Sequence, residues 1–209
     1  MSRFGSLILC ATLGAGLLGC GNKATSPKDP VSFVPLDNAV SGWTVDSAHN
    51  KNGSAQPMTA TTKEQAEGLI DGAAAPFYKV YTPKEFVWQN YVNGSLPAAP
   101  PDPNANPEGA TVVLYIWEMP SADQAGAIYT ALLQESEYAG NWQSTSPTLG
   151  SESRIEDTIT KWWINFHQDV FYVEVFFSPS FGPAPDYTPS DPDLKNEAMR
   201  FAQAVAAKI

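Results

Sequence analysis

The amino-acid sequence predicts an α+β fold, in which a twisted, mostly antiparallel sheet is packed by two to three helices. Residues 160–177 alternate large apolar side chains with others in two successive runs, and side chains in a strand repeat every second residue. Residues 110–119 are apolar on both faces, as is typical of a central, covered strand. Other segments repeat apolar residues with helical spacing and are predicted to cover the sheet.

The two runs in residues 160–177 predict a hairpin with one large apolar face. If residues 168–169 form a two-residue turn, Phe166 pairs with Phe171 and Ile164 with Val173. Gln-Asp is not a preferred pair for such a turn, so a longer loop with a shifted register is the alternative.

Length and composition predict a single domain. The chain has 209 residues, of which 43% are hydrophobic and 16% charged, as in globular proteins. We expect a signal peptide at residues 1–19, an acylated cysteine with a flexible tether at residues 20–30, and one domain at residues 31–209. The net charge of −10 argues against nucleic acid as a partner, since no basic patch is available to neutralise phosphates.

The first twenty residues read as a targeting segment. Arg3 precedes an apolar run at residues 7–18, which is too short to span a bilayer. The run ends in Leu17-Leu18-Gly19-Cys20, which looks like a bacterial lipobox and implies acylation of Cys20, including palmitate. The alternative is an ordinary secretory signal in which Cys20 is incidental.

This resemblance also predicts a location. Three acyl chains on Cys20 would hold the protein on a membrane, because one chain binds only marginally and each buried methylene adds about 0.8 kcal/mol. Gly21 follows the cysteine instead of Asp, which favours the outer membrane if the organism is Gram-negative. The two cysteines are Cys10 and Cys20, so a processed domain would contain no disulfide and no thiolate metal site.

The first half of the domain is expected to begin with a strand pattern at residues 33–40, followed by a turn at residues 50–53. A helix is predicted from a capping box of Thr62 and Gln65 to about Ile70. Beyond a bend at residues 71–72 we expect a second short turn, since Gly and Pro interrupt the pattern.

The second half is expected to contain strands at residues 86–92 and 110–119. A helix follows from Ser121, with Gln124 as its capping-box partner, to about Tyr138. Residues 141–157 are interpreted as turn-rich, with Trp142 docked on the sheet. The last helix is predicted to have Asp191 as its cap, ahead of Pro192.

The sequence contains few residues that could support metal or cofactor chemistry, and we expect no cofactor and no metal site. Its two histidines, His49 and His167, belong to no motif, and His167 is interpreted as a solvated residue at the hairpin tip. The strongest metal candidate is a calcium loop, which fails the EF-hand pattern because Pro107 replaces the required Gly. Its oxygen ligands would be Asp102, Asn104, Asn106 and Glu108, and a second acidic stretch contains Asp186, Asp191 and Asp193.

Glu174 is the strongest candidate for a ligand site. It interrupts the second face of the hairpin, beside Trp163 and Tyr172, and a carboxylate among aromatic rings resembles a small-molecule site. The alternative is an exposed or salt-bridged residue at the rim of the sheet. Glu118 also lies on a predicted strand, but a pair of catalytic carboxylates cannot be identified from spacing.

Several motifs together resemble a family of uncharacterised bacterial lipoproteins, a domain of unknown function. They are Leu36 with Gly42-Trp43, residues 69–78, residues 112–119 followed by residues 125–129, the aromatic hairpin and the final helix. The family pattern has two glycines after the Asp, whereas Gly72 is here followed by Ala73. The resemblance implies a sandwich similar to PsbP-like domains, no established activity, and no functional residue beyond Cys20.

These observations favour a lipid-anchored envelope protein that binds a ligand or an envelope protein partner without catalysis. The first alternative is a carboxylate-based hydrolase that acts on glycans of the envelope. The second is a structural component of the envelope.

Overall fold

The computed structural model describes residues 28–70, 82–96, 109–134, 140, 142–157, 162–178 and 192–209. Within these residues the chain forms an α+β fold with eight strands in one antiparallel sheet and three α-helices. The predicted fold class is therefore confirmed. Cys20 and the rest of the signal segment lie outside the described residues, and so do the second turn expected after residue 71 and the calcium-loop residues Asp102, Asn104, Asn106 and Glu108.

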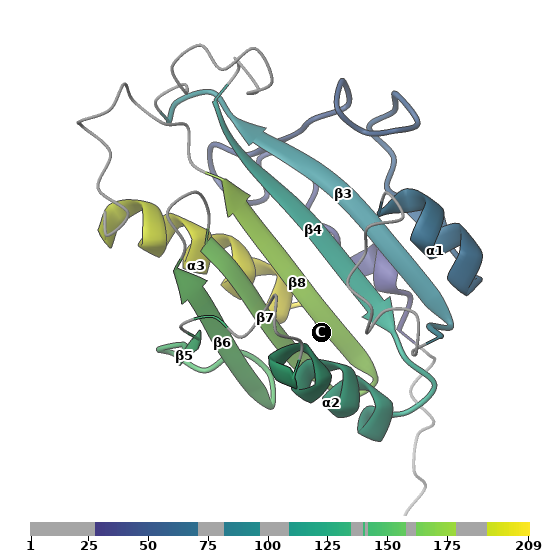
Figure 1. The fold of residues 1–209 in the computed structure, drawn as a ribbon. Coiled ribbons are helices and arrows are strands. Elements are labelled where there is room, and N and C mark those ends of the chain that lie inside the picture. Colours follow the sequence, from purple (N-terminus) through teal and green to yellow (C-terminus); the bar gives the residue numbers. More distant parts are fainter. Residues whose placement is uncertain are drawn as a thin grey trace, which may run out of the picture.

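The sheet has the strand order β1-β3-β4-β8-β7-β6-β5, and β2 pairs with the first half of β3, whereas β1 pairs with its end. Figure 1 shows the long strands β3, β4, β8 and β7 at its centre. The strands are β1 (Thr44–Val45), β2 (Met58–Ala60), β3 (Glu85–Asn93), β4 (Ala110–Glu118), β5 (Trp142–Ser144), β6 (Glu152–Asp157), β7 (Trp162–Gln168) and β8 (Phe171–Ser178). As predicted from its apolar faces, β4 is central, between β3 and β8.

The helices divide between the two faces of the sheet, as Figure 1 shows with α1 and α2 in front and α3 behind. They are α1 (Lys63–Leu69), α2 (Ala122–Ala131) and α3 (Pro192–Ala206), with 3-10 turns η1 (Pro30–Phe33) and η3 (Leu132–Gln134). Among the described residues, no helix combines the length and hydropathy that crossing a membrane requires.

Both predicted N-caps form, although the reciprocal bond of a full capping box is not seen among the described residues: the Gln65 side chain accepts from the Thr61 backbone N–H at 3.0 Å instead of from Thr62. The Thr62 hydroxyl accepts a hydrogen bond from the Gln65 backbone N–H at 3.2 Å, and the Ser121 hydroxyl accepts one from the Gln124 N–H at 3.3 Å. Each cap satisfies a donor that the first helical turn leaves without an intrahelical partner. A helix was predicted to reach about Tyr138. The α-helix α2 ends at Ala131, and the chain continues as the 3-10 turn η3.

One face of the sheet, here called the apolar face, is the main hydrophobic core. The predicted alternation holds, because the alternate residues of β7 and β8 are all buried there: Trp162, Ile164, Phe166, Phe171, Val173, Val175 and Phe177. Phe201 of α3 packs on this face against Trp43, with ring centroids 5.6 Å apart. Phe33 of η1 packs against Phe171 at 4.8 Å.

The hairpin register differs from the prediction. Phe166 pairs with Val173 and Ile164 with Val175, because the turn is Asp169-Val170 and not residues 168–169. Asp169 adopts φ 50°, a left-handed conformation that Asp tolerates better than most residues. The shift is two residues, so every side chain stays on its predicted face.

Two other predictions are wrong. Residues 33–40 form no strand, because Asp29 caps the 3-10 turn η1 and Asn38 adopts φ 57°. Residues 141–157 are not simply turn-rich, because they contain the strands β5 and β6. β6 was missed because its alternation is mostly polar, with Ile155 as its one large apolar side chain.

Candidate functional site

The opposite face of the sheet, here called the aromatic face, contains a line of polar side chains. Cross-strand pairing aligns Arg154 of β6 with Asn165 of β7, and Asn165 with Glu174 of β8. Glu174 in turn pairs with Tyr115 of β4, and Tyr115 with Trp88 of β3. Residues opposite each other on neighbouring strands share a face, so the register itself assembles a cation, an amide and a carboxylate in one row.

These polar groups are buried. Asn165, Tyr172 and Glu174 have no exposed surface, and Arg154 is only 4% exposed. Removing charged groups from water costs several kcal/mol per ion unless partners compensate. The row therefore costs free energy that an apolar row of similar volume would not.

Arg154 is held by aromatic rings and by two hydrogen bonds. Its guanidinium lies 4.0 Å from the centroid of the Tyr129 ring and 4.8 Å from that of Trp142. Its Nε donates to the Asn165 Oδ1 at 2.6 Å, and one terminal nitrogen donates to the backbone carbonyl of Tyr129 in α2. Burial lowers the pKa of Arg154, and contact with two aromatic rings stabilises the positive charge of its guanidinium.

Glu174 and Tyr172 form the other half of the site. The indole N–H of Trp117 donates to the Glu174 carboxylate at 3.1 Å. Burial raises the pKa of Tyr172 well above its usual value, and the nearby Glu174 carboxylate raises it further. Tyr172 therefore remains a neutral hydroxyl at physiological pH and is available as a hydrogen-bond donor.

Three donors of the site make no well-aligned hydrogen bond within the described residues, although the Tyr172 hydroxyl lies close to both the Glu174 carboxylate and the Arg154 guanidinium. They are one terminal nitrogen of Arg154, the amide nitrogen of Asn165 and the hydroxyl of Tyr172. Buried donors are normally paired, and leaving one unpaired costs about 1–3 kcal/mol. The site consequently has an unused capacity to bind groups that accept hydrogen bonds.

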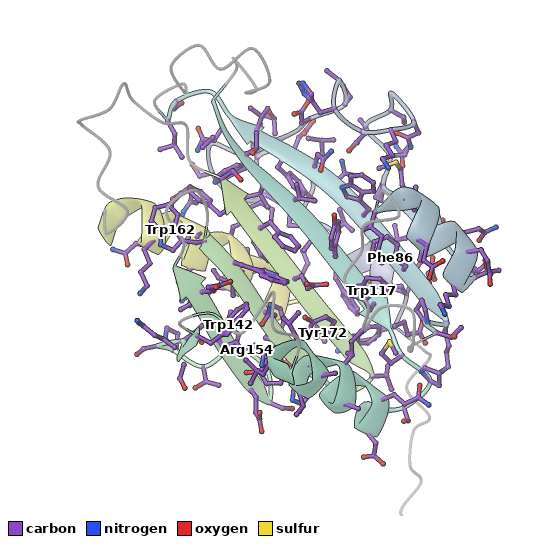
Figure 2. All side chains as sticks on the ribbon, viewed as in Figure 1. Phe86, Trp117, Trp142, Arg154, Trp162 and Tyr172 are labelled. Atoms are coloured by element: carbon purple, nitrogen blue, oxygen red, sulfur yellow. The ribbon has the colours of Figure 1, made fainter. Side chains whose placement is uncertain are left out.

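Aromatic rings surround the polar row. Trp163 stacks on Phe176 with centroids 4.8 Å apart, and Trp142 lies 5.2 Å from Trp163. The rings of Tyr115, Trp142 and Phe176 each remain partly exposed. Figure 2 shows Arg154 and Trp142 close to α2, with Tyr172, Trp117 and Phe86 following across the sheet toward β3.

The three residues predicted as a ligand site, Trp163, Tyr172 and Glu174, lie together on this face. The interpretation of Glu174 as a rim residue is wrong, because Glu174 lies in the middle of the sheet with no exposed surface. Sequence reasoning missed Arg154 and Asn165. Asn165 carried a signal, because it is a polar residue within an otherwise large and apolar strand, and the structure places it directly opposite Glu174, which interrupts the next strand.

His167 is also placed differently from the prediction. It is a half-buried residue of β7, and its ring centroid lies 5.1 Å from that of Tyr129 in α2. Burial lowers its pKa, because an interior disfavours the charged imidazolium. The ring of His49 instead lies 2.8 Å from the carboxylate of Asp46, which is buried beside it.

Glu118 does not lie on the same face of the sheet as Glu174. Neighbouring residues of β4 alternate between faces, and Glu174 pairs with Tyr115, so the side chain of Glu118 emerges on the opposite face. There it lies 3.5 Å from the ammonium of Lys84. The part of the chain that the structure describes contains no cluster of three or more residues suited to holding a metal ion. The acidic side chains of Asp186, Asp191 and Asp193 lie outside it.

Comparison of this chain with protein-family models, with curated proteins and with solved structures finds no match. The resemblance to envelope lipoproteins therefore stays a prediction from the sequence.

Proposed function

We propose that this chain is a lipid-anchored protein of a bacterial envelope that binds a ligand on its aromatic face without chemically changing it. The observation that carries the proposal is the buried row of Arg154, Asn165 and Glu174 with the adjacent Tyr172. Buried polar groups that lower the stability of the fold in this way are concentrated at functional sites.

The anchor in this proposal is the thioether-linked lipid on Cys20. Residues 21–27 would leave only a short tether between the lipid and Lys28, whose ammonium donates to the backbone carbonyl of Ile209. A flexible segment of this length reaches roughly 15 Å. The aromatic face would thus operate close to the surface of the bilayer.

Metabolic labelling with palmitate tests the anchor. The full chain expressed in a bacterial host is expected to incorporate the label, and Cys20→Ser is expected to lose it and to leave the membrane fraction. Cys10→Ser is the matched control and should keep the label. A Cys20→Ser variant that is still labelled would refute the assignment.

A binding protein is favoured over a hydrolase because the two strand carboxylates considered for catalysis, Glu118 and Glu174, lie on opposite faces. A glycosidase needs its two carboxyl groups on either side of one bond, about 5–10 Å apart. The positions of these two residues do not satisfy that requirement.

Two measurements on the full chain in detergent test the proposal together. Incubation with a panel of hydrolase substrates is expected to give no turnover above a buffer control. Fractions of an envelope extract are expected to include one that raises the melting temperature by roughly 5–10 °C at saturation. Turnover that depends on Glu174 would favour the enzyme, and the absence of any stabilising fraction would count against a binding role.

A further inference from the structure

We propose that Leu36 is a membrane contact, whose side chain enters the headgroup region of the bilayer that holds the lipid of Cys20. The inference rests on the anchor in the proposed function, because it adds a second contact with the same bilayer. It does not depend on what binds to the aromatic face.

Leu36 is the most exposed large hydrophobic side chain of the described residues. It is 77% exposed, and Leu133 follows at 44%. Single exposed leucines occur on many protein surfaces, so exposure alone assigns no role. Leu36 carries an inference because of the backbone that presents it and the position of the tether.

The backbone that leads into Leu36 is fastened by two other elements. The ammonium of Lys208, which follows α3, donates to the Val34 carbonyl at 2.9 Å. The hydroxyl of Tyr91 in β3 donates to the Pro35 carbonyl at 2.9 Å. These bonds hold the two residues before Leu36 against the body of the domain.

Leu36 itself opens a tight turn. The backbone N–H of Ala39 donates to the Leu36 carbonyl at 2.9 Å, and the Asp37 carboxylate accepts from the backbone N–H of Val45 in β1 at 2.6 Å. The exposed leucine is therefore presented by a backbone that is ordered on both sides. A contact made by such a residue costs little additional conformational entropy.

The tether reaches the domain at the same corner. The ammonium of Lys28 donates to the backbone carbonyl of Ile209, next to Lys208, whose own ammonium donates to Val34. The eight residue steps from Cys20 to Lys28 span at most about 29 Å. A lipid on Cys20 would therefore keep this corner of the domain near the bilayer, where exposed apolar side chains can enter the boundary between headgroups and acyl chains.

The charges at this corner favour an apolar contact over an electrostatic one. Lys28 and Lys208 are balanced by the exposed Asp29 and Asp37, so these four formal charges sum to zero. The whole chain carries a net charge of −10, whereas binding to anionic lipid depends on clusters of lysine and arginine. A leucine gains free energy from leaving water whatever the charge of the lipid, so we expect contact with a zwitterionic bilayer.

This contact would orient the sheet. Phe33 and Val34 pack into the core of the apolar face, and Figure 1 shows η1, in purple, behind the sheet on the side of α3, whereas α2 lies in front. Contact through the segment that follows η1 would direct the aromatic face away from the lipid.

A fluorophore sensitive to its environment, attached to one cysteine, tests the inference. The full chain is expressed in a bacterial host, and the acylated product is reconstituted in phosphatidylcholine vesicles that contain nitroxide-labelled lipid. The natural cysteines are Cys10 and Cys20, so loss of the signal peptide and acylation leave an introduced cysteine as the reactive thiol. Ala39→Cys places the fluorophore beside Leu36, and Thr130→Cys places it on the exposed side of α2, across the sheet.

We expect the nitroxide lipid to quench the fluorophore at residue 39 but not the one at residue 130. Leu36→Asp, combined with Ala39→Cys, should lower the ratio of contacting to lifted molecules about tenfold, because the burial of one leucine is lost. Leu36→Met is the matched control and should keep the quenching. Circular dichroism of each variant checks that it folds.

The possible results separate this inference from the anchor. Quenching at residue 39 that Leu36→Asp weakens and Leu36→Met keeps supports the contact. An acylated product in which neither fluorophore is quenched overturns the contact and leaves the anchor intact. Quenching that requires phosphatidylglycerol and survives Leu36→Asp overturns it in favour of binding by charge. A product that carries no palmitate overturns the anchor and the contact together.

Discussion

The two faces of the sheet are built from the same strands but differ in chemistry. On the apolar face, alternate residues of β7 and β8 are uniformly apolar, and α3 and η1 pack against them. On the aromatic face, the residues between them include Asn165, His167 and Glu174, among aromatic rings. One face therefore supplies stability, whereas the other holds polar groups that reduce it.

The largest expected difference between the faces comes from two neighbouring phenylalanines. Phe177→Ala removes a fully buried ring that contacts Trp43 and Trp162, and should lower the free energy of unfolding by about 3–5 kcal/mol. Phe176→Ala removes a partly exposed ring on the aromatic face, and should cost about half as much. Urea denaturation measures both, and equal losses would contradict the assignment of the main core to the apolar face.

The second-largest loss of stability is expected from removing one buried charge. Arg154→Met removes a buried cation that interacts electrostatically with Glu174, and we expect a loss of about 3 kcal/mol. The double variant Arg154→Met with Glu174→Gln should recover at least half of that loss, because neither charge then remains buried. A double-mutant cycle by urea denaturation gives the coupling, and additive losses would show that the two charges do not interact.

A smaller effect distinguishes two buried tyrosines. Tyr91→Phe loses the hydrogen bond to the Pro35 carbonyl and should cost about 1 kcal/mol. Tyr172→Phe removes a hydroxyl that makes no well-aligned hydrogen bond among the described residues, so it should cost less than Tyr91→Phe. Thermal unfolding of the unliganded variants compares them, and a larger loss for Tyr172→Phe would show that its hydroxyl is already satisfied.

The smallest effect concerns pH. The pKa of His167 is lowered in the folded state by burial, with Glu152 raising it and Arg154 lowering it. The unfolded chain therefore binds a proton more readily, so stability is complete above about pH 6.5 and falls as the pH drops toward the folded pKa. His167→Gln should flatten this part of the stability profile. Identical slopes for His167→Gln and the unmodified chain would show that His167 does not contribute.

Much of the fold could be predicted because it follows from apolar periodicity. The hairpin faces, the central strand β4 and the caps Thr62 and Ser121 depend on local patterns, and the structure confirms them. β6 could not be predicted in the same way, because its buried Arg154 depends on rings contributed by Tyr129 and Trp142. Local sequence does not encode a partner that lies on another element.

The candidate site was predictable only in part for the same reason. Trp163, Tyr172 and Glu174 were visible as neighbours in one hairpin, and the structure places them on one face. The pairing of β6 with β7 brings Arg154 beside Asn165, and that pairing is a long-range feature of the sheet.

The outermost strands of the sheet are very short, since β1 has two residues and β5 has three. Strands with few exposed amides offer little template for the addition of another chain. If these molecules are concentrated side by side on a lipid surface, the short edge strands would protect an aromatic-rich sheet from edge-to-edge fibre growth.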